Sequence, residues 1–285
     1  MHKKKVSIHD LKQAKVDQRK LVMLTAYDYP FGLLAEEAEA DIVLVGDSLG
    51  MVVMGLDGTV AVTMDTMIHH IQAVVRGCKA PLVVGDMPFM SYNVSIPEAI
   101  HNAGRLMKEG GCDVVKLEGG TDFAPTVQAI VKAGIPVMGH IGLTPQTASA
   151  LGGFKTQGRD LAGASQILED ARALEAAGAF SLILEAVPAP LGKLVAERVS
   201  IPVIGIGAGN DVDGQVLVTH DLIGLFDKFV PKFVKQYTQI RPTILDALTQ
   251  YSNEVRDQSF PAKEHSFSMP PETLNELLKL FDNMD

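Results

Sequence analysis

The chain has 285 residues, of which 47% are hydrophobic and 21% charged, a composition typical of a globular protein with a large core. Its formal net charge of −9 argues against binding to nucleic acid or to an anionic membrane surface, since both of these are negatively charged. No signal-peptide-like apolar stretch follows the basic residues 1–5, and no run reaches the roughly 18 apolar residues of a membrane helix. We expect Cys78 and Cys112 to be reduced core thiols of a cytoplasmic protein.

Short apolar runs alternate with amphipathic segments along the chain, which is typical of βα units with a parallel sheet. The segment near Ser95 shows a helix N-cap, and glycines such as Gly111, Gly134 and Gly178 indicate helix ends before strands. Seven or eight units of roughly 30 to 40 residues favour a closed (β/α)8 TIM barrel over an open sheet. Strands are expected to begin near Leu21, Ile42, Pro81, Asp113, Ile135, Phe180 and Ile201, with a weaker eighth over residues 215–224.

Two further segments stand outside this alternation. Residues 144–160 form a polar, glycine-rich stretch after the fifth strand, and a loop of that length is usually functional, so we expect a lid over the site. From about Arg241 the pattern changes to an amphipathic helix followed by a proline-containing segment and an acidic tail. We therefore expect a catalytic barrel domain over residues 1–267 and a C-terminal tail over 268–285, either a short helix or disordered.

Four of the expected strands end in an acidic residue. Because the carboxyl ends of parallel strands converge on the ligand, four such carboxylates indicate one site. Successive strand residues point to opposite faces, so Lys116 and Glu118 should enter the site together. By the same alternation, Asp47 should share a face with Val43 and Val45, Asp86 with Val84, and Glu185 with Ile183. The four acidic residues are Asp47, Asp86, Glu118 and Glu185.

A carboxylate cluster without cysteine or a convincing histidine pair favours Mg²⁺ or Mn²⁺ over Zn²⁺. Such a metal polarises a carbonyl and stabilises an enolate, while a free carboxylate removes the neighbouring proton. Lys116 is suited to holding a substrate carboxylate. The pattern thus predicts a Mg²⁺-dependent enzyme that forms the enolate of a 2-oxo acid.

Several of these residues also have a structural interpretation. Asp47 is suited to capping the turn that follows it, and Glu118 to pairing with Lys116. Glu185 fits a base, a further ligand or a structural ion pair, and His140, at the end of the fifth strand, fits either the site or the core. The adjacent pair His69-His70 fits packing better than metal binding, because neighbouring helix residues face different directions. The sequence GIGAG at 205–209 is a weak nucleotide signal.

The motifs that carry these residues resemble one family, ketopantoate hydroxymethyltransferase, also called 3-methyl-2-oxobutanoate hydroxymethyltransferase. This family belongs to the phosphoenolpyruvate/pyruvate barrel superfamily. The resemblance runs in order from about Ser7 to Phe267, and the tail beyond Phe267 is an extension without a family function. The motifs are YD at 27–28, VGDSLG at 45–50, GDMPF at 85–89, KLEGG at 116–120, GHIGLTPQ at 139–146, LE at 184–185, IGIGAG at 204–209 and DGQ at 213–215.

The resemblance implies transfer of a hydroxymethyl group from 5,10-methylenetetrahydrofolate to 3-methyl-2-oxobutanoate, which yields 2-dehydropantoate through a Mg²⁺-stabilised enolate. This reaction is the first committed step toward pantothenate and coenzyme A. The resemblance also implies one Mg²⁺ per subunit, which Mn²⁺ or a similar ion can replace, and a cytoplasmic homo-oligomer, typically a decamer built as a pentamer of dimers.

Carried over position by position, the resemblance implies a role for each residue of the cluster. Glu185 matches the proton acceptor. The metal site corresponds to Asp47, Asp86 and Glu118, and the substrate-binding residues are Asp47, Ser48, Asp86, Lys116 and His140.

Three other functions are compatible with parts of this pattern. A superfamily lyase would share the barrel and the metal but should carry a cysteine in an active-site loop, and none follows the fourth or fifth strand. A phosphate-binding synthase barrel requires a clearer phosphate loop after the seventh strand. A non-catalytic metal-binding protein would need no base at Glu185.

Overall fold

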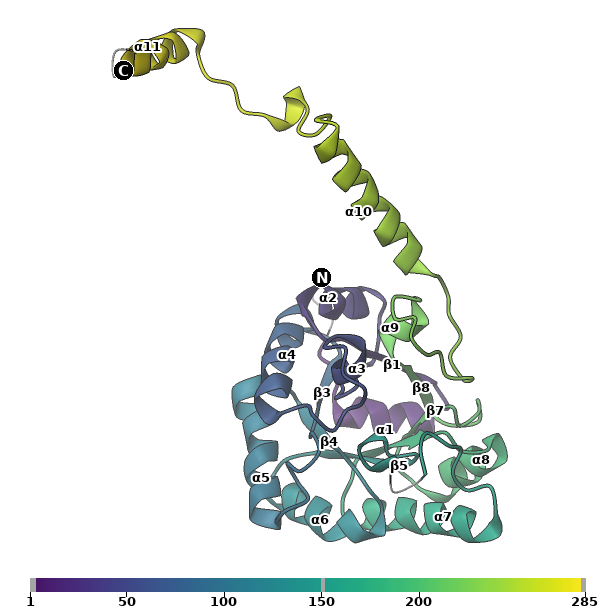
Figure 1. Ribbon diagram of the computed structural model, residues 1–285. Helices are drawn as coiled ribbons and strands as arrows, with labels where there is room; N and C mark the ends of the chain where they lie inside the picture. Colours follow the sequence, from purple (N-terminus) through teal and green to yellow (C-terminus); the bar gives the residue numbers. More distant parts are fainter. Residues whose placement is uncertain (1–3, 150–151, 283–285) are drawn as a thin grey trace. The chain divides into compact units, whose positions relative to one another are not determined.

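A computed structural model of the protein describes residues 4–149 and 152–282 (Figure 1). The chain divides into two compact units, Met1–Tyr237 and Thr238–Asp285, which are described separately. Within the described residues, no helix combines the length and the apolar character needed to cross a membrane.

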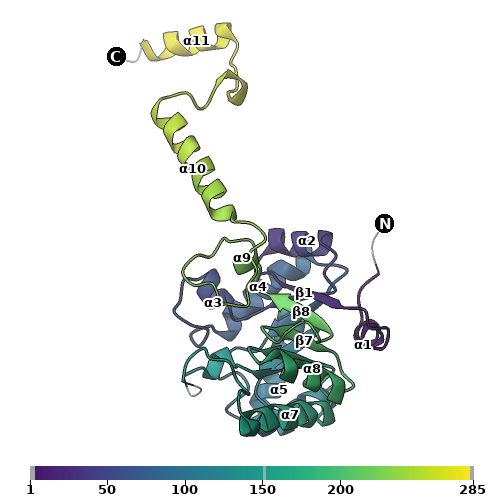
Figure 2. The same ribbon diagram turned by 90° about the vertical axis from the view of Figure 1, so that its right-hand side faces the viewer.

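The first unit is a closed barrel of eight parallel strands in sequence order (Figures 1 and 2). Each strand pairs with its neighbours along the chain, and β8 closes the barrel by pairing with β1, with Leu21 opposite Gly214. The expected (β/α)8 barrel is confirmed. The strands are β1 Leu21–Thr25, β2 Ile42–Val45, β3 Leu82–Asp86, β4 Val114–Glu118, β5 Val137–Gly142, β6 Ser181–Glu185, β7 Val203–Ile206 and β8 Gly214–Leu217.

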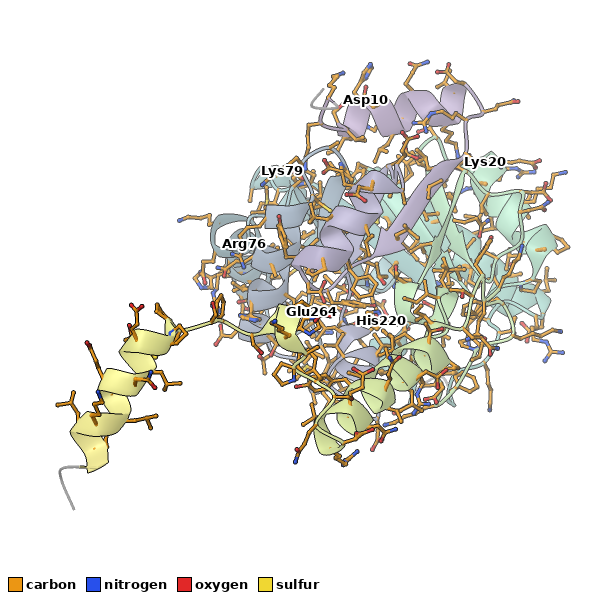
Figure 3. The ribbon with its side chains drawn as sticks, turned by 90° about the horizontal axis from the view of Figure 1, so that it is seen from above. Asp10, Lys20, Arg76, Lys79, His220 and Glu264 are labelled. Atoms are coloured by element: carbon orange, nitrogen blue, oxygen red, sulfur yellow. The ribbon has the colours of Figure 1, made fainter. Side chains whose placement is uncertain are left out.

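Helices surround the barrel on the outside (Figure 1). All but α1 and α9 lie between consecutive strands, and α9 follows β8. Helix α1 precedes β1 and contributes the buried residues Leu11 and Ala14 (Figure 3 labels Asp10 on this helix). The helices of this unit are α1 Ile8–Val16, α2 Tyr29–Glu37, α3 Leu49–Val52, α4 Met64–Gly77, α5 Ile96–Arg105 with the π-helical turn η1 Leu106–Gly110, α6 Ala124–Lys132, α7 Leu161–Ala176, α8 Ala189–Arg198 and α9 Thr219–Leu222, with 3₁₀ turns η2 Thr121–Phe123 and η3 Pro145–Thr147.

Local signals in the sequence account for several of these boundaries. Ser95 is the N-cap of α5, and its side chain accepts a hydrogen bond from the backbone N–H of Glu98. Gly111, Gly134 and Gly178 all have positive φ values after a helix, as expected for C-terminal caps. The expected eighth strand over 215–224 was wrong at its end: β8 stops at Leu217 and the chain then forms α9.

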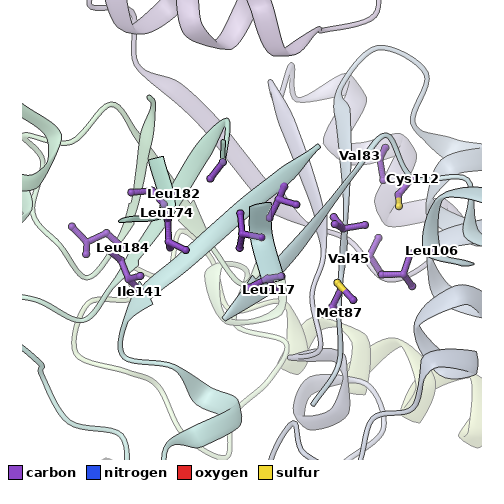
Figure 4. Close-up of a cluster of buried hydrophobic side chains, with 14 of the residues drawn as sticks. Val45, Val83, Met87, Leu106, Cys112, Leu117, Ile141, Leu174, Leu182 and Leu184 are labelled. Carbon is purple, nitrogen blue, oxygen red and sulfur yellow. The ribbon is translucent and has the colours of Figure 1, made fainter. Parts of the chain in front are cut away.

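Two apolar layers hold the barrel together. One fills its interior and contains Ile42, Leu44 and Ile183 together with Leu11 of α1. The other lies between the strands and the surrounding helices, where it contains side chains such as Val45, Val83, Leu117, Ile141 and Leu184 (Figure 4).

These layers correct one expectation about strand faces. Asp47 was expected to share a face with Val43 and Val45, but both valines belong to the outer layer under the helices. Asp47 instead faces the cavity at the end of the barrel. Strand β2 ends at Val45, so Gly46 and Asp47 lie beyond the hydrogen-bonded ladder and the alternation of side chains does not extend to them. For Asp86 and Glu185 the expected alternation is correct, because Val84 and Ile183 are interior residues.

The second unit consists of α10 Ile240–Arg256, the short 3₁₀ turn η4 Lys263–His265 and α11 Pro271–Asp282. It supplies the C-terminal helical extension that the sequence predicted, including the helix expected from about Arg241. The compact units divide between Tyr237 and Thr238. The functional boundary expected at 267/268 stays a prediction.

Candidate active site

A cavity of about 390 Å³ lies at the carboxyl ends of the strands. Strand-end residues from around the barrel line it, from Thr25 in β1 to Val218 just after β8. Two loops also contribute: the segment after β5 with Phe154 and Lys155, and the segment after α9 with Phe233. The acidic strand ends expected from the sequence all reach this cavity. They are Asp47, Asp86, Glu118 and Glu185.

Asp47 and Asp86 are neighbouring buried acids of the cavity. The backbone N–H of Asp47 donates to Asp86 Oδ2 at 3.0 Å, so the two residues are in direct contact. Burial raises the pKa of Asp47, and the Asp86 carboxylate raises it further. The pKa of Asp86 is also raised, first by burial, although Lys116 opposes the shift. A cation bound by these two neighbouring buried carboxylates would stabilise both charged forms.

Lys116 places an ammonium group between two of the acids. Its Nζ lies 2.7 Å from Asp86 Oδ1 and 3.8 Å from Glu118 Oε1. Burial alone would lower the pKa of Lys116, but Asp86 and Glu118 outweigh burial and raise it, so the ammonium stays charged. The expected pairing of Lys116 with Glu118 is therefore present, but the contact with Asp86 is shorter.

His140 connects this group to Glu185. Its Nδ1 lies 3.5 Å from Glu118 Oε1 and 3.4 Å from Lys116 Nζ, while Nε2 lies 3.2 Å from Glu185 Oε2. Burial and Lys116 lower the pKa of His140, but hydrogen bonds to Glu118 and Glu185 overcome them and raise it to about 9. The imidazole is thus positively charged near neutral pH and forms a second cation of the cavity, one that sequence reasoning did not assign.

Gln146, the last residue of the motif at 139–146, has no role predicted from the sequence, yet it is central to the site. Its Nε2 donates to Asp47 Oδ2 at 2.8 Å and to the carbonyl of Met87 at 3.0 Å, and its backbone N–H donates to Glu118 Oε2 at 3.0 Å. The hydroxyl of Tyr92 donates to Gln146 Oε1 at 2.6 Å. A single polar residue in a loop leaves no periodic pattern in the sequence. The only sequence signal for Gln146 was its position just after a strand that carries active-site residues. The Asp47 carboxylate therefore accepts from Gln146, and the turn that follows Asp47 is not capped by it.

Ser48 follows Asp47 at the cavity wall. Its Oγ lies 2.8 Å from the hydroxyl of Tyr27, a fully buried residue that follows β1. The backbone carbonyl of Tyr27 in turn lies 2.6 Å from Nδ1 of His70. His70 therefore packs against Tyr27 while His69 is exposed, in agreement with the structural interpretation of the pair.

Glu185 differs from the other acids in its environment. Its side chain is 14% exposed, the most accessible carboxylate of the strand-end set. Its carbonyl accepts a hydrogen bond from Leu143 N–H at 2.9 Å, and the next residue, Ala186, has a φ of 49°. Gly142 has a φ of 89° beside it, and a Cβ there would lie 2.3 Å from the carbonyl oxygen of Glu185. Backbone strain and close approach therefore coincide at the end of β6, where the candidate base lies.

The donor set fits a hard divalent cation at Asp47 and Asp86. Asp86 Oδ1 is buried and, among the described residues, has no partner in hydrogen-bond geometry, although Lys116 is close to it. Within residues 4–149 and 152–282, no group of three His, Cys, Asp or Glu side chains is arranged to hold a metal ion. Asp47 accepts from Gln146, Asp86 lies beside Lys116, and Glu118 is engaged by Gln146, Lys116 and His140. A carboxylate has about four lone-pair sites, so these contacts leave Asp47 and Asp86 able to accept a cation, and Mg²⁺ commonly takes one or two carboxylates.

The fold and the site together define a (β/α)8 barrel with a buried, charged cavity at the carboxyl ends of its strands. The structure of 2,3-dimethylmalate lyase, described as a PEP mutase/isocitrate lyase superfamily member, superimposes with a TM-score of 0.57 at 14% identity, covering 97% of this chain and 96% of that chain. A phosphonopyruvate hydrolase in complex with oxalate and Mg²⁺ gives a TM-score of 0.59 at 11% identity, with coverage of 90% and 92%. At such identities the likeness concerns the fold alone.

Sequence comparison identifies the family of this chain. The family described as ketopantoate hydroxymethyltransferase matches residues 5–263. The 3-methyl-2-oxobutanoate hydroxymethyltransferase of Heliobacterium modesticaldum is 60% identical over 269 residues, which cover 94% of this chain and 98% of the relative. The chain therefore belongs to the ketopantoate hydroxymethyltransferase family and is a hydroxymethyltransferase.

Proposed function

We propose that the protein transfers a hydroxymethyl group from 5,10-methylenetetrahydrofolate to 3-methyl-2-oxobutanoate and releases 2-dehydropantoate. This is the first committed step toward pantothenate and coenzyme A, and we place it in the cytoplasm. The observation that carries the proposal is the division of the cavity by His140: Nδ1 faces the Lys116 and Glu118 group, and Nε2 faces Glu185. One edge of the imidazole thus meets a charged binding group, and the other meets a separate candidate base.

The proposed metal site consists of Asp47, Asp86 and Glu118, with one Mg²⁺ per subunit and Mn²⁺ as a possible replacement. The raised pKa values of Asp47 and Asp86 and the free lone pair of Asp86 Oδ1 support a cation there. When bound, the metal supplies polarisation of the 2-oxo group and stabilisation of the enolate charge.

The 2-oxo acid is anionic, and the cavity offers two buried cations to it. Lys116 is the proposed partner of the substrate carboxylate, and the charged His140 adds a donor to an oxygen of the oxo acid. Ser48, at the cavity wall, provides a hydroxyl for the same substrate. Asp47 and Asp86 are proposed to contact this substrate as well, because they lie beside the metal. Charge-assisted hydrogen bonds of this kind orient a small acid in one direction.

Glu185 is the proposed general base that removes the proton from C3 of the oxo acid. The resulting carbon nucleophile forms a bond to the one-carbon unit of the folate, water supplies the hydroxyl oxygen, and tetrahydrofolate leaves. His140 at 3.2 Å from Glu185 Oε2 orients the carboxylate, and the strained backbone at Ala186 holds its position. The carbon nucleophile must be shielded from premature protonation, and the loop over 144–160, with Phe154 and Lys155 at the cavity, is the proposed lid.

Exchange of the C3 hydrogen with solvent deuterium tests this proposal, because it reports proton removal alone. NMR of 3-methyl-2-oxobutanoate in D₂O, with enzyme and Mg²⁺ but without folate, should show loss of the C3 hydrogen signal. Removal of Mg²⁺ by a chelator should stop the exchange, and readdition should restore it. A protein that makes 2-dehydropantoate but never exchanges this hydrogen without folate would contradict the proposed order of steps.

Two further properties are proposed from family membership. We expect a homodecamer built as a pentamer of dimers, which light scattering of the purified chain tests through its mass. We also retain residues 1–267 as the catalytic portion and 268–285 as a tail without a catalytic role, since the family match ends at residue 263. A chain truncated after Phe267 that loses its activity while it stays folded would contradict this division.

A further inference from the structure

Asp221 is a buried acid of the cavity that the proposed mechanism does not use. It lies in the short helix α9, is 7% exposed and lines the same cavity as Asp47 and Glu185. Its Oδ1 has no hydrogen-bond partner among the described residues. Burying an unpaired carboxylate costs stability, so an acid in this position calls for a ligand that donates hydrogen bonds to it.

The surroundings of Asp221 hold it in a fixed place. Just before it, the backbone N–H and the hydroxyl of Thr219 both bond to Thr25 at the end of β1. The adjacent His220 packs its ring 5.2 Å from that of Tyr27 (Figure 3 labels His220), and the hydroxyl of Tyr27 contacts Ser48. Asp221 is thus tied to the cavity wall that carries Ser48, which brings it into the neighbourhood of the reacting groups.

The part of the cavity that α9 and the following loop form is apolar. Val218 precedes Asp221, and Phe226, Phe229 and Phe233 follow it along the same lining. Met51 and Val52 of α3 contribute further apolar surface. A flat heteroaromatic ring with hydrogen-bond donors along one edge matches a carboxylate set among such side chains.

We propose that Asp221 binds the 2-amino-4-oxopyrimidine edge of the pterin of the folate donor, with its carboxylate accepting from N3–H and from the 2-amino group. The proposal rests on the proposed function, since it concerns the second substrate of that reaction. The oxo acid is an anion that Asp221 repels and that Lys116 attracts, so the two substrates are separated by charge. The pterin edge offers two parallel donors to one carboxylate, the bidentate arrangement that gives strong, directed bonds.

Charge also sets the direction of the rest of the folate. Its glutamate carboxylates are repelled by Asp221, whereas Lys155 and Lys232 line the cavity and are both exposed. These lysines come from the two loops that contribute to the cavity. The pterin is therefore expected to point inward toward Asp221 and the glutamate outward toward the lysines.

Calorimetric binding of tetrahydrofolate to the full-length protein tests the proposal without catalysis. Asp221→Asn should weaken binding by about ten- to a hundredfold, the loss expected for a charge-assisted pair. The matched control Asp211→Asn removes the same charge from an exposed residue and should leave the affinity unchanged. Folate-independent exchange of the C3 hydrogen should proceed in Asp221→Asn at the wild-type rate.

A folate analogue identifies the group that Asp221 contacts. The 2-desamino-2-methyl analogue of tetrahydrofolate lacks the amino donor, so it should bind the wild type more weakly than tetrahydrofolate does. Asp221→Asn should lose less affinity for this analogue than for tetrahydrofolate, because only the bond from N3–H remains to be lost. Equal tetrahydrofolate affinity in wild type and Asp221→Asn would overturn the proposal, and so would an equal loss for both folates or a parallel loss of oxo-acid binding. Failure of exchange in the wild type counts against the proposed function instead.

Discussion

The two ends of the barrel are built from the same parallel strands and yet serve opposite purposes. At the amino ends, Leu21 and Ile42 pack with Leu11 of α1 in a mainly apolar interior. At the carboxyl ends, a buried set of charges surrounds Lys116 and His140. The first end gains stability from burial, and the second gives up stability to hold charges ready for a substrate. Substitutions at the two ends should therefore change different measurable quantities.

The largest effect is expected at the charged end. Asp47→Ala or Asp86→Ala removes a proposed direct ligand, and loss of a ligand should exceed the 10- to 100-fold effect typical of its supporting contacts. We expect Mg²⁺-dependent activity to fall by more than about a hundredfold while the fold survives. Calorimetry with Mg²⁺ measures the cause, and unchanged binding of Mg²⁺ and oxo acid in both variants would contradict the assignment. Glu118→Gln should have the milder effect on metal affinity.

The apolar end should respond in stability alone. Leu11 is fully buried under the barrel, and Leu11→Ala should lower the free energy of unfolding by about 2–5 kcal/mol through lost burial and a cavity. The rate of C3 hydrogen exchange at a temperature where the variant is folded should stay within twofold of wild type. Chemical denaturation and exchange measured on one preparation would separate the two quantities, and a large loss of exchange rate would show that the ends are coupled.

Substrate recognition should show an intermediate effect. Lys116→Ala removes the buried ammonium proposed to hold the substrate carboxylate, and one charge-assisted hydrogen bond contributes about 1.5 to 3 kcal/mol. The oxo-acid KM should rise roughly ten- to a hundredfold. Steady-state kinetics over a range of oxo-acid concentrations provides the measurement. An unchanged KM would assign Lys116 a structural role as the partner of Asp86 and Glu118.

A smaller effect, visible only through its pH dependence, is expected at Asp221. Burial raises the pKa of Asp221 from 3.8 to about 6 in the folded protein. Below about pH 4 the carboxyl is protonated in both the folded and the unfolded state, so it costs nothing. As the pH rises, the unfolded state ionises first, and the penalty on the folded state grows until about pH 6. This penalty on the folded state reaches at most about 3 kcal/mol, because each unit of pKa shift corresponds to about 1.36 kcal/mol.

Asp221→Asn removes this titration. The free energy of unfolding of the variant, relative to wild type, should therefore rise between pH 4 and pH 7 and stay level above that. Urea denaturation at a series of pH values gives the comparison. Parallel profiles for the two proteins would mean that the carboxyl is not strained by burial. A gain in stability here would also mark Asp221 as a residue kept for function.

The barrel could be predicted from the sequence because strands and helices alternate regularly along the chain. Apolar runs bounded by glycine and proline mark strands, and the strand ends follow from them, so Asp86, Lys116, Glu118 and Glu185 were placed on the cavity side by counting alone. Counting alternate residues fails beyond the end of a strand, where the hydrogen bonds between neighbouring strands stop. Asp47 reaches the cavity because the chain leaves β2 at Val45, and alternation has no meaning beyond the last paired residue.

The remaining site residues depend on tertiary contacts. Gln146 acts through bonds to Asp47 and Glu118, which are distant in sequence, and neither bond leaves a local pattern. Asp221 fell inside the expected eighth strand, because the apolar residues around it resemble a strand in composition while the chain forms α9. The charge of His140 likewise arises from Glu118 and Glu185 acting together across two strands.

The central claim is that Glu185 is the base, and one measurement tests it most directly. Glu185→Gln keeps the size of the side chain and removes its basicity, and Glu197→Gln removes the same charge from an exposed site as a control. In D₂O with Mg²⁺ and without folate, Glu185→Gln should exchange the C3 hydrogen of 3-methyl-2-oxobutanoate at least about a hundredfold more slowly than wild type, within the range of general-base catalysis. Oxo-acid binding should persist. Exchange by Glu185→Gln at the wild-type rate would contradict the account and show that another group removes the proton.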